Sequence, residues 1–308
     1  MDNQSYTNFK KTVCDHLSSL LDKNVINGIW WINKKENEYK NVPHILKIKN
    51  CNSKKEQKKE QENVVKEYNL LKVISQSESK FLLMGKLHRY AHHLNSSQIM
   101  CYNFFRPQLD DNKQVKEPLI KLLQSIGVFF NETNESAEAE FEYEDEKSKE
   151  PYRKTNFDFF IKMGETRVYF EIKYTENGFG TCEDDKKGEH RKKFNNYYKG
   201  EMKKCGIIKK SAINWNETFR KYYQLVRNAI KVGEKSFVVI ITDERNFLTN
   251  KQLCDFEKEM IENAKNRSHL ICISWQELCN NADSCGFSET HINQFRQKYY
   301  LSRELKKL

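Results

Sequence analysis

The chain of 308 residues lacks the features that mark membrane and secreted proteins. No uninterrupted apolar stretch approaches the roughly 20 residues that a membrane-spanning helix needs. The segment Met1–Gln4 does not begin the basic and then apolar pattern of a signal peptide. The nine cysteines are odd in number, lie scattered between Cys14 and Cys285, and include no Cys-x-x-Cys pair. We therefore expect a cytoplasmic protein with reduced thiols and no membrane partner.

The chain also lacks the short motifs of several large enzyme classes. It has no Walker loop, no dinucleotide-binding fingerprint, no His-Glu-x-x-His pair and no nucleophile elbow. The closest cysteine cluster is Cys272, Cys279 and Cys285, and its spacing does not fit a common zinc site. These absences exclude most rival enzyme classes and predict that the protein uses no nucleotide cofactor.

What the chain does contain is an excess of basic residues in a foldable composition. Hydrophobic residues make up 38% and charged residues 31%, and the net charge of +10 favours a polyanionic partner. One basic segment contains Lys186, Lys187, Arg191, Lys192 and Lys193. Such a segment suits contacts with a phosphate backbone, although a solvated loop is the simpler explanation for any single lysine.

Two short apolar runs, Asn156–Met163 and Arg167–Thr175, are typical of neighbouring β-strands. Gly164 lies between them, where a hairpin needs a turn. Side chains of a strand alternate between its two faces. We therefore expect one face of the first run to carry Phe157, Phe159 and Ile161, and one face of the second to carry Val168, Phe170 and Ile172.

The opposite faces of these runs carry Asp158 from the first and Glu171 and Lys173 from the second. Two carboxylates and a lysine then converge on one side of a sheet. Oxygen ligands suit Mg²⁺, which can activate water and neutralise a phosphodiester. The alternative is a salt bridge on an exposed sheet face, contributing less than about 1 kcal/mol. Glu-x-Lys also occurs in polar stretches with no aspartate on a preceding strand, beginning at Glu56, Glu78, Glu201 and Glu304.

The remaining patterns predict an α/β order. Helices are expected over 86–93, 116–126 and 216–230, and strands over 140–143 and 237–242. The N-terminal part contains a possible helix over 13–21, a strand over 28–32 and a helical stretch over 50–71. The C-terminal part contains possible helices over 254–266 and 290–305, with a strand over 270–274.

The two central strands resemble the core of the PD-(D/E)XK superfamily, the restriction-endonuclease-like nucleases. Asn156-Phe157-Asp158 stands where many members have Pro-Asp, so the proline is absent here. Four segments resemble, more specifically, a bacterial group of restriction-endonuclease-like proteins: Asn95–Gln98, Phe170–Glu176, Gly178–Gly180 and Tyr223–Asn228. The resemblance extends over about residues 86–242.

The resemblance implies an αβββαβ core whose mixed central sheet is flanked by helices, with extensions at both ends. Residues 1–85 would form an N-terminal extension, which is a candidate for DNA recognition. Residues 86–308 would form the nuclease domain with its C-terminal helices. A homodimer that pairs two active sites is a reasonable expectation.

The resemblance also implies a metal site. Asp158 and Glu171 would hold Mg²⁺, or Mn²⁺ as its substitute, with the main-chain carbonyl of Ile172. Lys173 would position or deprotonate the attacking water, or stabilise negative charge, and a nearby cation would lower its pKa. Glu117 would complete the metal site in this family, but the helix dipole alone also favours a carboxylate in a first helical turn.

A second group of candidates lies on the helix expected after the catalytic strands. The amide of Gln224 would bind the water or the scissile phosphate, and Arg227 and Asn228 would contact nucleic acid. Hydrogen bonding at the helix surface is the alternative for all three. The glycines of Gly178–Gly180 permit close approach to a ligand, and a plain turn explains them equally well.

The sequence thus predicts an endonuclease that hydrolyses double-stranded DNA, most simply a restriction enzyme. One alternative is a structure-directed repair or recombination nuclease, or a defence nuclease without sequence preference, because the same three residues serve all of these. The other is a DNA-binding module that no longer cleaves.

Overall fold

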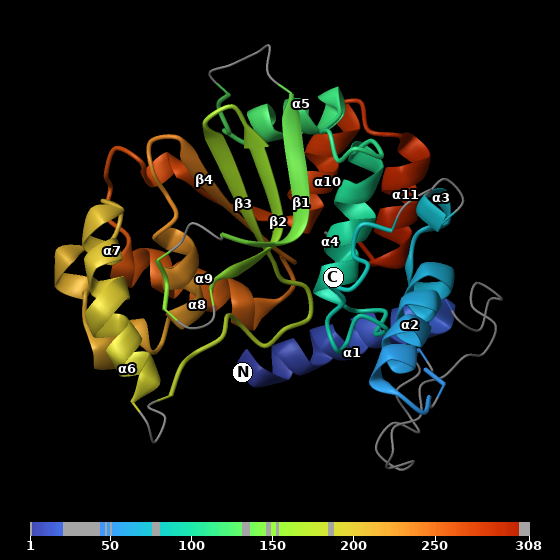
Figure 1. Cartoon of the computed structure of the whole chain (residues 1–308), viewed down its shortest axis with the longest axis horizontal. Coiled ribbons are helices and arrows are strands. Elements are labelled where there is room, and N and C mark those ends of the chain that lie inside the picture. Colours follow the sequence, from blue (N-terminus) through green and yellow to red (C-terminus); the bar gives the residue numbers. More distant parts are fainter. Residues whose placement is uncertain are drawn as a thin grey trace. The chain divides into compact units, whose positions relative to one another are not determined.

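The structure is a computed structural model that describes residues 2–20, 44–46, 48–49, 51–75, 81–130, 136–145, 149–151, 154–183 and 188–301 (Figure 1). The chain divides into two compact units, one of residues 1–119 and 275–308 and one of residues 120–274. The C-terminal helices therefore belong with the N-terminal segment. The division of roles at residue 85 stays a prediction.

The second unit contains a five-stranded sheet in the order β1-β2-β3-β4-β5. Its strands are β1 (Ala137–Glu144), β2 (Asn156–Met163), β3 (Thr166–Ile172), β4 (Ser236–Thr242) and β5 (Leu270–Ser274). The first three strands run antiparallel, whereas β3, β4 and β5 run parallel. Gly164, with a φ of 55°, makes the turn between β2 and β3. The α/β class and the mixed sheet flanked by helices are confirmed.

Helices that follow β3 pack on one face of this sheet (Figure 1). Their core is built largely from aromatic side chains, because Phe219 and Phe256 join Tyr169 of β3 in one buried cluster. The helical elements of the unit beyond α5 are α6 (Glu189–Lys193), η4 (Phe194–Tyr198), α7 (Lys199–Lys204), η5 (Lys210–Ala212), η6 (Trp215–Phe219), α8 (Tyr223–Ala229), α9 (Phe247–Met260) and η7 (Arg267–His269). Helix α5 (Glu117–Ser125) spans the division between the units.

The regular alternation of side chains fails on the two strands beside the predicted site. Glu142 of β1 has a φ of 53°, in the left-handed region that β-strands do not use. Phe157 packs on Tyr169 with ring centroids 4.8 Å apart, whereas Phe159 packs on Phe170 at 5.4 Å. Tyr169 and Phe170 are successive residues of β3 and point to opposite faces. The prediction that Phe157 and Phe159 share a face is therefore wrong, because the strand pair is locally irregular.

The first unit is helical in its described part. Helix α4 (Ser97–Phe105) is its buried centre, and Ser96 caps it by accepting a hydrogen bond from the Ile99 amide at 3.5 Å. Phe104 of this helix contacts Trp275 and Phe295. The other helical elements are α1 (Asp2–Leu20), α2 (Lys54–Val64), η2 (Val65–Asn69), α3 (Lys72–Ser75), η3 (Arg106–Gln108), α10 (Trp275–Ser284) and α11 (Glu289–Lys298).

The helix predicted over 86–93 is wrong, because this segment consists of turns. The side-chain amide of Gln98 forms hydrogen bonds with two backbone groups of this segment. The His88 amide donates to Gln98 Oε1 at 2.9 Å, and Gln98 Nε2 donates to the Lys86 carbonyl at 3.1 Å. Backbone groups satisfied in this way have no need of a helical ladder.

Other predicted boundaries differ from the structure. The helix expected over 216–230 is two elements, η6 and α8, separated at Tyr222, whose φ of −116° is not helical. Helix α9 begins seven residues before the expected position 254 and ends at Met260, and α11 ends at Lys298 rather than at 305. The strand expected over 28–32 lies outside the described residues.

None of the described helices combines the length and the apolar character needed to cross a membrane.

Candidate active site

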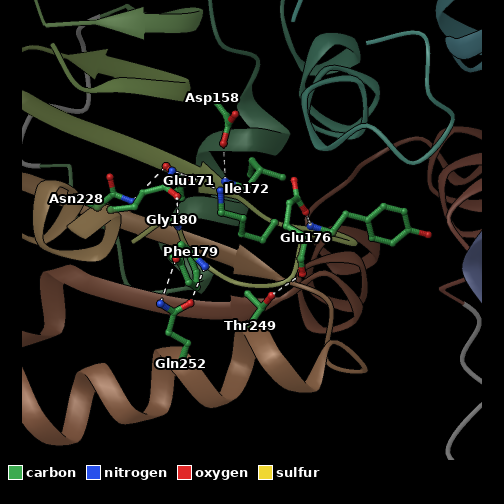
Figure 2. Close-up of polar contacts among 12 residues, drawn as sticks. Asp158, Glu171, Ile172, Glu176, Phe179, Gly180, Asn228, Thr249 and Gln252 are labelled. Carbon is green, nitrogen blue, oxygen red and sulfur yellow. Dashed lines mark hydrogen bonds and ion pairs between the residues drawn. The ribbon is translucent and has the colours of Figure 1, made fainter. Parts of the chain in front are cut away.

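The structure brings Asp158 and Glu171 to neighbouring positions on β2 and β3 (Figure 2). Phe159 pairs with Phe170 in the antiparallel ladder, so continuing the register by one residue places the two carboxylates opposite each other. Asp158 Oδ2 accepts a hydrogen bond from the Ile172 amide at 2.7 Å. This bond fixes the aspartate against the end of β3, which contains Glu171 and is followed by Lys173.

Glu171 is held by three donors and is almost fully buried, with 4% of its side chain exposed. Its Oε1 accepts from Lys173 Nζ at 2.8 Å and from Gln224 Nε2 at 2.7 Å. Its Oε2 accepts from Asn228 Nδ2 at 3.2 Å. Gln224 and Asn228 are four residues apart on α8 and therefore lie on one helix face, which points at Glu171.

The amide of Gln224 is engaged at both ends. While Nε2 donates to Glu171, Oε1 accepts from the Gly180 amide at 3.1 Å, and the Gln224 amide nitrogen donates to the Gly180 carbonyl at 3.2 Å. This geometry orients Glu171 and joins it to the loop after β3. Contact of this amide with water or phosphate stays a prediction.

Asp158 has a pKa well above its ordinary value of 3.8. Burial is the largest cause, and the neighbouring charges of Glu171 and Glu142 add to it. Lys173 and the Ile172 amide oppose the shift without cancelling it. Asp158 is therefore a carboxylate whose charged form the protein alone stabilises poorly.

The pKa of Lys173 is raised, whereas the sequence analysis expected a nearby cation to lower it. Burial lowers its pKa, but Glu171, Glu176 and Asp158 outweigh this effect. Among the protein groups alone, the pKa of Lys173 is therefore raised above its ordinary value of 10.5. Lys173 Nζ forms an ion pair with Glu171 Oε1 at 2.8 Å.

A third glutamate lies close enough to act electrostatically on Asp158, and the sequence did not single it out. Glu142 of β1 is buried, with 7% of its surface exposed, and its left-handed φ interrupts the strand. Its carboxylate accepts a hydrogen bond from Asn156 Nδ2 at 2.5 Å. Strained backbone of this kind is found preferentially at functional sites. The sequence did not distinguish Glu142, because every second residue of β1 is a glutamate.

The loop that carries Gly178–Gly180 is clamped by a residue that the sequence did not indicate. Gln252 of α9 donates from Nε2 to the Phe179 carbonyl at 3.1 Å and accepts from the Phe179 amide through Oε1 at 2.7 Å (Figure 2). Gln252 Nε2 also donates to the Lys221 carbonyl at 3.2 Å. Nothing in the local sequence distinguishes this glutamine from other polar residues of an amphipathic helix.

Replacing Gly178 with alanine is expected to destabilise the protein by about 1–3 kcal/mol and to lower any activity of the site. Gly178 has a φ of 133°, and an added Cβ would lie 2.5 Å from Gln252 Oε1, which would break the clamp on Phe179. The unfolding midpoint in urea measures the loss. Gly200→Ala in α7 is the matched control, because its Cβ would meet nothing within 4 Å and alanine favours a helix. Equal midpoints for the two variants would contradict this account of the loop.

The other predicted residues lie in different settings. Arg227 is committed to a buried network, in which it pairs with Glu150 at 3.1 Å and donates to Thr155 Oγ1 at 3.1 Å. Asn228 is fully buried, so its observed partner is Glu171. The nucleic-acid contacts of both residues stay predictions. Glu117 is exposed in the first turn of α5, and its part in a metal site also stays a prediction.

The residues of the predicted basic segment also differ in their exposure to solvent. Arg191 and Lys192 are exposed on α6, whereas Lys193 is buried. Lys186 and Lys187 lie outside the described residues. Two of the five predicted phosphate contacts are therefore seen in a position that is open to a ligand.

The donor set of the site fits Mg²⁺. Asp158 and Glu171 offer carboxylate oxygens, and the Ile172 carbonyl belongs to the same strand end. Magnesium is held by one or two carboxylates and keeps several waters, so it needs no cage of protein groups. In the described ranges, no three histidine, cysteine or acidic side chains are grouped to share a metal ion. Burial is the largest cause of the raised pKa of Asp158, and the charges of Glu171 and Glu142, which a bound cation would offset, add to it.

Comparison with known proteins gives one match. The sequence model of the family described as "Restriction Endonuclease associating with ARP" matches residues 33–300. No curated protein and no solved structure matches the chain significantly. The match extends over most of the chain and includes all residues of the site described above.

Proposed function

The chain belongs to the family of restriction endonucleases associating with ARP, and on this premise we propose that it is a Mg²⁺-dependent endonuclease that hydrolyses DNA phosphodiester bonds. The juxtaposition of Asp158, Glu171 and Lys173 at the end of β3 carries the proposal. We assign α5, β1, β2, β3, α8 and β4 to a restriction-endonuclease-like αβββαβ core.

The two carboxylates and the lysine have different roles in this proposal. Mg²⁺, when bound, supplies charge that neutralises the phosphodiester and lowers the pKa of a water molecule. Asp158 and Glu171 would hold the ion with the Ile172 carbonyl. Lys173 would position the attacking water or stabilise negative charge on the scissile phosphate.

Gln224 and Asn228 act through Glu171 as positioning residues. Both donate to its carboxylate, and their helix fixes its orientation before a metal or substrate arrives. Groups that orient metal ligands typically contribute 10–100-fold to metal affinity or activity. The link from Gln224 to Gly180 extends this support to the loop that follows β3.

The proposed substrate is double-stranded DNA, with a 5′-phosphate and a 3′-hydroxyl as products. The net charge of +10 and the exposed Arg191 and Lys192 on α6 support contacts with a phosphate backbone. A homodimer would provide two active sites for the two strands. The family description also names an association with ARP.

Two other functions compete with this proposal. A structure-directed or non-specific defence nuclease would use the same three residues on different DNA. A binding module without cleavage would have no need of Lys173 paired with Glu171 in a buried site. The buried ion pair at 2.8 Å therefore favours an enzyme over a binding module.

The experiment that tests the proposal compares wild type with Lys173→Met on plasmid and phage DNA, with Mg²⁺ or with EDTA. Wild type should cleave only with Mg²⁺, and the variant should be slower by about 100-fold or more, because it loses the charge beside Glu171. Lys204→Met removes a lysine from an exposed ion pair with Glu201 and is the matched control.

The outcomes separate the candidate functions. Discrete bands support a restriction enzyme, and a smear supports a nuclease without sequence preference. Equal activity of wild type and Lys173→Met would contradict the assigned site. DNA binding by wild type without cleavage of any substrate would favour the binding module.

A further inference from the structure

The unit of residues 1–119 and 275–308 contains a cavity of about 260 Å³ that the proposed nuclease site does not use. Most of its wall is apolar and includes Leu17, Leu20, Leu70, Leu71 and Leu94. An engineered cavity of about 150 Å³ lined by apolar side chains binds benzene. The present cavity is therefore large enough for a small organic ligand.

The wall of this cavity also contains a lysine whose described hydrogen-bond acceptors are both uncharged. Lys298, the last residue of α11, is half-buried and donates to the main-chain carbonyl of Asn69 and, at 2.8 Å, to Asn69 Oδ1. In the part of the chain that the structure describes, no carboxylate pairs with it. Burial lowers its pKa to about 7. An ammonium group with only neutral partners in an apolar wall is poorly compensated, and an anion would compensate it.

The walls are fixed by hydrogen bonds between segments far apart in the sequence. His16 Nε2 of α1 lies 2.7 Å from the Gln297 carbonyl of α11. The Val73 amide of α3 donates to Gln294 Oε1 of α11 at 3.1 Å, and Figure 1 shows these two helices side by side. The cavity is therefore preformed, as ligand sites usually are.

We propose that this cavity binds a small amphiphilic carboxylate, with its apolar body against the leucines and its head paired with Lys298. The apolar wall stabilises the body through burial. The lysine selects the sign of the head group, because it provides positive charge without a protein anion to neutralise it. An apolar cation would bring a second positive charge to the same place.

The test is calorimetric titration of the full chain with decanoate, and with decylamine as a ligand of equal length and opposite charge. Decanoate should bind saturably below its micellar range, and decylamine should not bind. Lys298→Met should weaken decanoate binding at least tenfold. Lys72→Met should change it less than threefold, because Lys72 lines the same cavity but is exposed.

One further variant and a folding measurement distinguish loss of binding from misfolding. Leu20→Trp leaves Lys298 in place and fills the cavity from the half-buried end of α1, so it should also abolish decanoate binding. A cooperative thermal transition shows that each variant is folded. The proposal is overturned if decylamine binds as well as decanoate, if wild type binds neither ligand, or if folded Leu20→Trp retains decanoate binding.

Discussion

Replacing Asp158 with asparagine is expected to reduce Mg²⁺-dependent DNA cleavage by about 100-fold or more and, at the same time, to stabilise the metal-free protein. The amide keeps an oxygen that can accept the Ile172 hydrogen bond but removes the charge that would hold a cation. Stability should rise by about 1 kcal/mol or more at neutral pH, because burial and two neighbouring carboxylates disfavour the charged aspartate.

The dependence of this stability on pH has a defined sign. A carboxyl whose pKa is raised on folding binds its proton more tightly in the folded than in the unfolded protein. The free energy of unfolding of the metal-free wild type should therefore fall as the pH rises from about 3.8 through the raised pKa of Asp158. This fall in the free energy of unfolding with rising pH should be absent from Asp158→Asn.

Urea unfolding in EDTA across this pH range, followed by the same measurement with Mg²⁺, checks the prediction. Mg²⁺ should stabilise wild type and have little effect on Asp158→Asn, since only the former retains both carboxylates. Asp255→Asn, which affects a surface ion pair with Lys251 on α9, is the control. A lower stability of Asp158→Asn than of wild type in EDTA would contradict the described electrostatics.

Replacing Glu171 with glutamine is expected to reduce cleavage as much as Asp158→Asn does. Unlike Asp158→Asn, it should destabilise the protein by about 3 kcal/mol. Glu171 accepts hydrogen bonds from Lys173, Gln224 and Asn228. Its loss would leave the buried ammonium of Lys173 without the carboxylate with which it forms an ion pair at 2.8 Å. Removing one member of a buried ion pair costs more than the pair contributes, because the remaining charge is left uncompensated.

The unfolding midpoint at neutral pH measures this loss. Glu165→Gln is the matched control, because Glu165 pairs with Lys235 at the exposed turn of the same hairpin and its removal should not shift the midpoint measurably. The two active-site substitutions thus have the same effect on cleavage and opposite effects on stability. Destabilisation by both would mean that the carboxylates are equivalent in the folded protein, contrary to their hydrogen bonding.

Much of the site follows from the sequence, because strand periodicity is a local property. The apolar run Asn156–Met163 became β2 with the expected bounds, and the hairpin turn at Gly164 set the register that places Asp158 against Glu171. The position of Gln224 on a helix after the two central strands was also predictable. The Glu-x-Lys motif at Glu171 is distinguished by these neighbours, since the Glu-x-Lys motifs that begin at Glu56 and Glu201 lack them.

Boundaries and faces were less predictable where non-local contacts compete with local preference. The segment 86–93 has a helical pattern, but the amide of Gln98 holds its backbone in turns. The left-handed Glu142 disturbs the alternation that would place Phe157 and Phe159 on one face. Each exception depends on a residue from another segment, so a window of sequence does not contain the cause.

The sequence by itself determined the α/β class, the two central strands and the identity of the acidic and basic groups on them, because these depend on residue type and a period of two. Only the tertiary structure decided how those groups are partnered. It joined Gln224 and Asn228 to Glu171, placed Gln252 on the glycine loop and committed Arg227 to Glu150. These partners are 53 to 77 residues apart in the sequence, and packing of the core rather than any local pattern sets the distance between them in space.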